Sequence, residues 1–242
     1  MNMEIGPVGI GCGTRGADHA RRAARSAGLV LAIAVRTLPA ADLYVAVDGA
    51  GDGTSPASPT NSLQGAIDAI SGAYVTNTVW VDRGVYNSGG RTNWPSGTVL
   101  SNRVVINKVI TVRSLHDDPA NTVIMGQWDP VATNGPAAVR CVYLSSGARL
   151  IGFTMTNGAT LGLDSPTPGT SHNQNGGGTW TGTTATLVSN CIYSGNSAAW
   201  SGGGAYYGTL KDCLLTGNRA GMDLDPAVQK NKGGGGACYA GL

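Results

Sequence analysis

A short phrase occurs twice near the C-terminal end of the sequence. The first copy runs from Val188 to Ala198 and the second from Leu210 to Ala220, displaced by 22 residues, and a run of three glycines precedes each copy. A fixed period in this range is typical of one structural unit stacked on itself. Because 22 residues cannot hold a strand, a crossover helix and a return strand, the repeat predicts one turn of a β-solenoid.

The apolar residues of each phrase follow the spacing Φ-x-x-Φ-x-Φ, which favours short strands with alternate side chains directed inward. The Gly-Asn pair that closes each phrase predicts a corner, since both residues tolerate left-handed backbone. Stacked Asn side chains can also hydrogen-bond along the axis. The expected inward residues are Val188, Cys191, Tyr193, Leu210, Cys213 and Leu215, with a looser earlier set at Leu150, Phe153 and Met155.

Residues 1–41 have the pattern of a secretory signal. Arg21, Arg22 and Arg25 precede an apolar run of about eight residues, and small residues at 40–41 offer a cleavage point. The run is shorter than the roughly 20 residues of a membrane-spanning helix. A buried core helix is the alternative interpretation. The pattern predicts an exported protein, secreted or at the cell surface, with no membrane span in the mature chain.

The charge balance changes once this leader is set aside. Residues 42–242 carry 12 Asp, 7 Arg and 4 Lys, so the formal charge of +2 for the whole chain comes from the leader. No basic field remains to attract nucleic acid, so we expect no nucleic-acid partner. About 200 residues suffice for one domain with a sizeable core.

Four cysteines follow the leader: Cys141, Cys191, Cys213 and Cys238. An even count in an exported protein suggests disulfides, and stacked coils would bring Cys191 and Cys213 within bridging range. A column of buried, unbonded thiols packing as small hydrophobes is the interpretation we favour.

A segment with its own pattern, residues 42–77, precedes the solenoid expected over residues 78–242. Asn61 stands three residues before Gln64, which suggests a capping box. Leu63, Ala66, Ile67 and Ile70 mark one apolar face of a short helix. Since an end coil exposes apolar core and strand edges, this helix is expected to cap the first coil.

The stretches LYVAVDGAGDGTSPASPTNSLQGAIDAI, VWVDRGVY, ITVRSL and TVIMG resemble the N-terminal part of right-handed parallel β-helix proteins of the pectate-lyase-like superfamily. The series GGGTW, NCIYSGNSA, GGGAYYGTLKDCLLTGNRA and GGGGACYAGL resembles the repeats of large exported bacterial surface proteins, adhesin-like in kind, and distantly those of polymorphic outer-membrane proteins. The resemblance covers Leu43 to Leu242. It implies an all-β, right-handed parallel β-helix, and it says little about activity because this fold hosts many functions. Residues 234–242 begin another copy of the phrase without completing it, so we expect a helix truncated at its C-terminal end, from a truncated gene or as a fragment of a longer array.

The resemblance also raises the alternative of a polysaccharide lyase or glycoside hydrolase. The W-[IV]-D-H motif of the lyases is only echoed by Trp80-Val81-Asp82-Arg83, which lacks the histidine. The best remaining acidic and basic group is His116, Asp117, Asp118, Asp129 and Arg140. A solvated turn bounded by Pro119 is the interpretation we favour for its first three members.

Asp48 and Asp52 stand at positions 1 and 5 of a calcium-loop pattern, but Ala50 and Pro59 occupy positions where ligands should be. We therefore expect a glycine-rich turn in which Asp side chains accept hydrogen bonds from backbone N–H groups. Apart from the calcium alternative, we predict no cofactor. His172 is expected to be exposed, in a loop over residues 160–175.

Trp180, Trp200, Tyr206 and Tyr207 lie in or beside the repeats. They could stack on sugar rings or simply fill the interior and the turns, and the sequence leaves both open. We expect an exported surface or extracellular β-helix module with a structural, adhesive or carbohydrate-contacting role and no identifiable catalytic site, whose partners are polysaccharide or cell-surface components.

Overall fold

The computed structural model describes residues 42–71, 77–163, 171–221 and 234–241, which all belong to one unit, Leu38–Leu242. The leader expected over residues 1–41 lies outside the described residues. Within this part of the chain the structure is mostly β, with two short helices, α1 (Leu63–Ala69) and α2 (Ser171–Gln174). Every pairing between named strands is parallel.

The strands form three larger sheets and one short pair. Sheet A contains β1 (Leu43–Val45), β2 (Thr78–Val81), β5 (Thr111–Ser114), β8 (Arg149–Ile151), β11 (Leu187–Ser189) and β15 (Thr209–Lys211). Sheet B contains β3 (Gly84–Tyr86), β6 (Thr122–Met125), β9 (Thr154–Thr156), β12 (Ile192–Ser194) and β16 (Leu214–Thr216). Sheet C contains β4 (Ser101–Ile106), β7 (Val139–Leu144), β10 (Thr179–Thr181), β14 (Ala205–Tyr206) and β18 (Ala237–Cys238). The short pair is β13 (Ser197–Ala198) with β17 (Arg219–Ala220).

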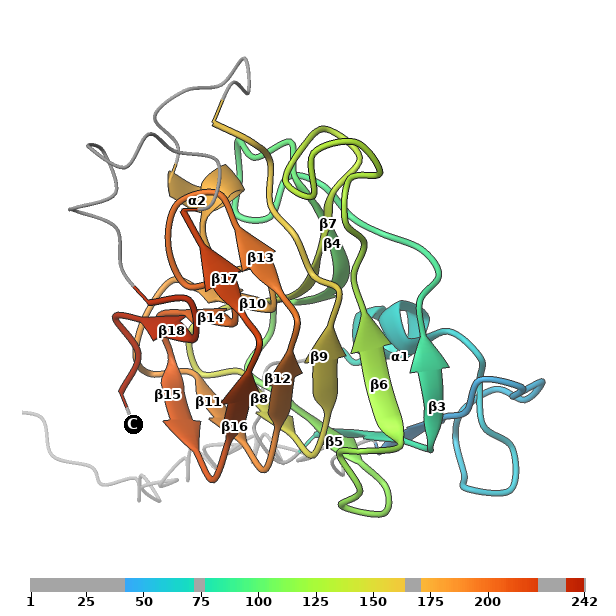
Figure 1. Ribbon diagram of the computed structural model, residues 1–242. Helices are drawn as coiled ribbons and strands as arrows, with labels where there is room; N and C mark the ends of the chain where they lie inside the picture. The colour runs from blue at the N-terminus through green and yellow to red at the C-terminus, as the bar shows by residue number, and fades with distance from the viewer. Residues whose placement is uncertain (1–41, 72–76, 164–170, 222–233, 242) are drawn as a thin grey trace, which may run out of the picture. The chain divides into compact units, whose positions relative to one another are not determined.

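From β2 onward the chain passes through sheets A, B and C in that order, and we call each passage a coil. Within each sheet, every strand pairs with the equivalent strand of the coil before it, as the row β3, β6, β9, β12 and β16 shows in Figure 1. This stacking is compatible with the β-solenoid that the repeated phrase predicts.

The register pairs the two phrases residue by residue. Val188 pairs with Leu210 in sheet A, and Tyr193 pairs with Leu215 in sheet B. The earlier apolar set is also in register, since Leu150 pairs with Val188 and Met155 with Tyr193. Seven of the nine expected inward residues are buried, and Cys213 and Leu215 are half-buried. The buried ones are Leu150, Phe153, Met155, Val188, Cys191, Tyr193 and Leu210.

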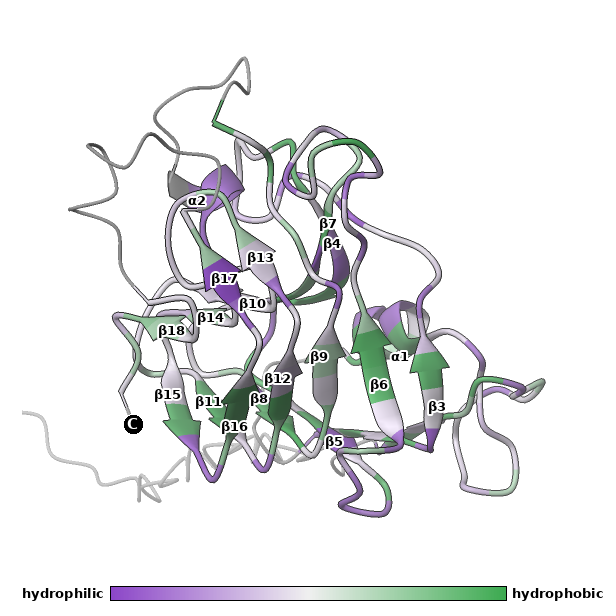
Figure 2. Ribbon diagram, viewed as in Figure 1, coloured by the Kyte–Doolittle hydropathy of each residue, from purple (hydrophilic) through white to green (hydrophobic). Residues whose placement is uncertain are grey.

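Like residues therefore form apolar columns that run through the core from coil to coil. The column of sheet A consists of Leu43, Val79, Val112, Leu150, Val188 and Leu210. In Figure 2 the strands of sheet B carry hydrophobic segments, whereas the corners that follow β11 and β15 are hydrophilic. The core is thus a continuous interior shared by all coils.

The corner after sheet B combines left-handed glycines with a ladder of asparagines. Gly195 and Gly217 have φ values of 64° and 63°, so they supply the left-handed turn. Asn196 Nδ2 donates to Asn218 Oδ1 at 2.9 Å, and Asn218 Nδ2 donates to the Tyr193 carbonyl at 2.9 Å. The expected hydrogen bond between stacked asparagines is confirmed, while the left-handed conformation belongs to the glycine of each pair.

The glycine runs precede strands of sheet C, and they allow the backbone there to lie close to the backbone of the adjacent coil. A Cβ atom at Gly203 would lie 2.0 Å from the Arg219 carbonyl oxygen and 2.6 Å from that of Gly235. These backbone atoms belong to the following coil, so a side chain at Gly203 would force the two coils apart. The glycine runs thus have a packing role.

Helix α1 packs against β1, β2 and β4, and its apolar face is buried as expected: Leu63, Ala66, Ile67 and Ile70. The predicted capping box is wrong, because Ser62 is the N-cap and its hydroxyl accepts from the Gly65 N–H at 3.0 Å. Gln64 instead bonds the edge strand β4, donating to the Val105 carbonyl and accepting from the Val105 N–H. The side-chain amide of Gln64 thus forms hydrogen bonds that a neighbouring strand would otherwise form with this edge.

We predict that Asn196→Ala destabilises the protein by about 2 kcal/mol, because it leaves buried backbone groups without partners. Asn196 is almost fully buried; it donates to the Met155 carbonyl and accepts from the Gly158 N–H, both at 2.9 Å. Urea unfolding followed by circular dichroism measures the change.

Asn121→Ala is the control, since this exposed asparagine has a single side-chain bond to Asp118. Its loss should cost no more than about 0.5 kcal/mol. Equal effects of the two substitutions would contradict a structural role for the asparagine ladder.

Candidate functional site

The turn between β5 and β6 carries three of the predicted site residues, and each has an ionic or hydrogen-bonded partner. His116 Nε2 lies 2.9 Å from Asp82 Oδ1. Arg113 holds the Asp117 carboxylate through two contacts of 3.0 and 2.6 Å. Hydrogen bonds from Asn121 and Arg83 hold the pKa of Asp118 below its usual value.

These pairs lie on the surface, where ion pairs contribute little to stability. Their geometry is that of an ion-paired surface turn, and each carboxylate is already engaged by an arginine or the histidine. A solvated turn stays the prediction for these three residues, and a catalytic role stays the alternative.

Asp129 lies elsewhere, in the loop between β6 and β7. Its carboxylate accepts three backbone N–H groups, from Val131 at 2.9 Å, Ala132 at 3.1 Å and Ala137 at 3.0 Å. The bonds from Ala137 and Val131 are the main reason that the pKa of Asp129 is lowered. The Asp129 carboxylate therefore stabilises the loop in which it lies.

Arg140, the last of the five candidates, is fully buried on β7. Its guanidinium donates to the Gly176 carbonyl and to Asn102 Oδ1, both at 2.7 Å, and to the Asn175 carbonyl at 2.9 Å. It also donates to the His172 carbonyl. Burial lowers the pKa of Arg140. The arginine thus ties α2 and the following glycine run to sheet C.

In the Asp48–Gly53 turn, Asp52 is the residue with side-chain bonds. Its Oδ1 accepts from the Thr54 N–H at 3.0 Å and the Thr54 hydroxyl at 2.8 Å, and these bonds lower its pKa. Within the described ranges no group of three His, Cys, Asp or Glu side chains comes together as a metal site. Calcium at Asp48 and Asp52 stays a prediction.

An aromatic row runs along the face of sheet C that points away from the core. Successive strands place Val105, Tyr143, Trp180, Tyr206 and Cys238 in register. The first four form an apolar cluster separate from the main core. Tyr143 and Trp180 stack with ring centroids 5.5 Å apart and an interplanar angle of 10°.

The row ends in three tyrosines, Tyr206, Tyr207 and Tyr239, which we call the tyrosine platform. Tyr207 and Tyr239 stack at 5.3 Å with an interplanar angle of 21°, and Tyr206 meets both edge to face. Tyr206 is buried, Tyr207 is half-buried and Tyr239 is 67% exposed. The platform thus presents aromatic surface to solvent.

The predicted aromatic candidates are therefore partly brought together. Trp180, Tyr206 and Tyr207 belong to the row or its platform, whereas Trp200 is 41% exposed in the turn after β13 and is not among the row's ring contacts. The expectation that His172 is simply exposed is wrong: it is half-buried in α2 and meets Trp180 edge to face at 4.9 Å. This short helix also replaces part of the expected loop.

Sequence reasoning missed Tyr143 and Tyr239. A signal was available for the row, because Trp180 and Tyr206 each stand two residues after a run of three glycines. Tyr239 follows the third run by three residues, and Tyr143 has no such marker.

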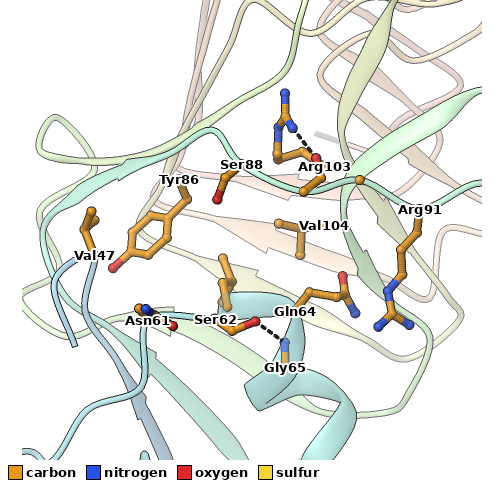
Figure 3. A pocket seen from close by; sticks show the side chains of 13 residues that line it. Val47, Asn61, Ser62, Gln64, Gly65, Tyr86, Ser88, Arg91, Arg103 and Val104 are labelled. Atoms are coloured by element: carbon orange, nitrogen blue, oxygen red, sulfur yellow. Dashed lines mark hydrogen bonds between the residues drawn. The ribbon is translucent and has the colours of Figure 1, made fainter. Parts of the chain in front are cut away.

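A cavity of about 550 Å³ lies between α1, the chain after β3 and strand β4 (Figure 3). Asn61, Ser62, Gln64 and Ser88 supply polar groups to its wall, and none of its lining residues is acidic. Arg91 pairs with Asp68, and Arg103 donates to the Met125 carbonyl at 2.8 Å and to that of Gly89. The volume is within the range of small-molecule sites.

No protein-family model, curated protein or solved structure matches this chain. Among the described residues, no helix has the length and apolar character needed to cross a membrane.

We predict that Arg140→Ala destabilises the protein by about 3 kcal/mol, because several buried carbonyl groups lose a charged donor. The exposed Arg149, on β8, the next strand along the chain, is the matched control, and its replacement by Ala should cost no more than about 0.5 kcal/mol. Thermal unfolding measures both. An Arg140→Ala protein as stable as the unaltered one would contradict the structural role.

Proposed function

We propose that the stacked coils form a right-handed parallel β-helix of the pectate-lyase-like kind, with α1 as its N-terminal cap. The order of the strands within the three parallel sheets supports this proposal. Connections between parallel strands of one sheet are right-handed in nearly all proteins, which favours that hand here. The burial of the apolar face of α1 against the first coil supports the capping role.

We propose further that the chain is an exported module that contacts carbohydrate at a cell surface or outside the cell. The observation that carries this proposal is the tyrosine platform. Tyrosine combines a large apolar ring with a polar hydroxyl group, so it can pack against the C–H face of a sugar and hydrogen-bond a neighbouring hydroxyl. A stacked pair, open to solvent, offers such a face.

The backbone of the platform gives a second argument. Tyr207 and Tyr239 have φ values of 59° and 54°, in the left-handed region that bulky residues rarely adopt. Each such residue costs on the order of 1 kcal/mol, and strain of this kind gathers at functional sites. Two successive coils keep a tyrosine at the strained position, which supports a role for these rings beyond packing.

The alternative of a polysaccharide lyase or hydrolase receives less support. Its five candidate residues lie on three different segments: the turn after β5, the loop after β6 and strand β7. Arg140 is buried under α2, and Asp129 is bound by backbone amides of its own loop. A surface for binding is therefore the function that the geometry favours.

We predict that Tyr239→Ala and Tyr207→Ala each weaken binding to a polysaccharide about tenfold, because a stacked aromatic contact is worth about 1 kcal/mol or slightly more. Affinity electrophoresis against a panel of soluble plant and bacterial polysaccharides provides the measurement. Trp128→Ala is the control, since Trp128 is 42% exposed on another loop. Failure of every polysaccharide to retard the protein, or equal retardation of all variants, would exclude the platform as a carbohydrate site.

The export proposal has its own test. When the full chain is produced in a bacterial host, we expect the exported protein to begin at Asp42, because small residues at 40–41 precede it after the apolar run. N-terminal sequencing of the material outside the cytoplasm gives the answer. Protein that stays in the cytoplasm with residues 1–41 attached would contradict export.

A further inference from the structure

Cys191 and Cys213 occupy equivalent places in consecutive coils. Each stands immediately before a strand of sheet B, and those strands pair in register, with Ile192 opposite Leu214. The Leu214 N–H donates to the Cys191 carbonyl at 2.9 Å, which joins the two cysteine segments directly. Paired strands lie about 4.8 Å apart, within the Cα separation that a disulfide can span.

The two thiols share the same kind of environment, because each bonds to backbone carbonyl groups. Cys191 Sγ lies 3.2 Å from the Ser189 carbonyl oxygen, and Cys213 Sγ lies 3.3 Å from the equivalent Lys211 carbonyl oxygen. Both side chains therefore leave the backbone in the same way. Both are free thiols in this structure.

We propose that Cys191 and Cys213 are a cross-linking site, at which a small-molecule disulfide converts the two thiols into a disulfide bond between consecutive coils. In the first step the Cys213 thiolate attacks one sulfur of oxidised glutathione, which forms a mixed disulfide and releases one glutathione thiolate. The Cys191 sulfur then attacks Cys213 Sγ, which releases the second glutathione. The two cysteines lose two electrons and two protons, and two molecules of reduced glutathione carry them away.

The environment assigns different roles to the two sulfurs. Cys191 is almost fully buried, and burial raises its pKa, so it is poorly placed to start the exchange. Cys213 is half-buried, and its interaction with the Cys191 side chain lowers its pKa to about 7. A larger fraction of Cys213 is therefore thiolate at neutral pH than of an ordinary cysteine, whose pKa is about 8.5. The rate of the first step should rise through about pH 7 and level off above it.

The test uses the whole protein with its cysteines reduced, exposed to oxidised glutathione at pH 7.5. We expect a loss of about two mass units, a Cys191–Cys213 peptide after digestion and recovery of both thiols with dithiothreitol. Closure of the span between the two cysteines should also raise the temperature of unfolding.

Variants separate the two steps. Cys191→Ser should stop at a glutathione adduct on Cys213, and Cys213→Ser should acquire neither adduct nor cross-link at this pair. Cys238→Ser is the matched control and should cross-link like the unaltered protein, because Cys238 lies on sheet C. A stable glutathione adduct on Cys213 of the unaltered protein, a cross-link between other cysteines or no reaction at all would each overturn the proposal. The unaltered protein alone suffices for that decision, so it does not depend on the folding of the variants.

Discussion

In-register parallel pairing between consecutive coils is the constraint on which the rest of this structure depends. Each strand takes its hydrogen bonds from the equivalent strand one coil away, so a residue lies above its counterpart and not beside an unrelated neighbour. An inward position must then be apolar in every coil, as Val188 and Leu210 are. A polar residue is tolerated inside only if it bonds along the stack, as Asn196 does with Asn218.

The same constraint determines which parts of the chain can vary in length and which cannot. The step from one coil to the next is 22 residues between Val188 and Leu210 but 38 between Val112 and Leu150, and the strands stay in register in both. The connections between the sheets absorb the difference. The exposed and half-buried aromatic side chains gather on the outward face of sheet C, at the tyrosine platform and around Trp180. Arg140 links this face to α2 by hydrogen bonds.

Sequence reasoning succeeded where the signal was local and repeated. The spacing of Val188, Cys191 and Tyr193 predicted which side chains are buried, and the apolar face of α1 was found from four residues. It failed where a partner distant in sequence decides the outcome. Gln64 was expected to cap its own helix, yet it bonds Val105, 41 residues away. Arg140 was a catalytic candidate because the sequence shows its charge. The sequence does not show that α2 brings the His172 carbonyl group into contact with its guanidinium. The tyrosine platform includes Tyr239 from a separate coil, so no single segment of the sequence predicts it.

The most direct test of the stacking is a nuclear Overhauser spectrum of isotope-labelled protein, which detects protons of paired strands. The register predicts backbone contacts between Val188 and Leu210 and between Ile192 and Leu214, with the slanted pattern of parallel strands. Contacts of Val188 with any other strand in place of Leu210, or an antiparallel pattern between these segments, would contradict the coil-on-coil arrangement.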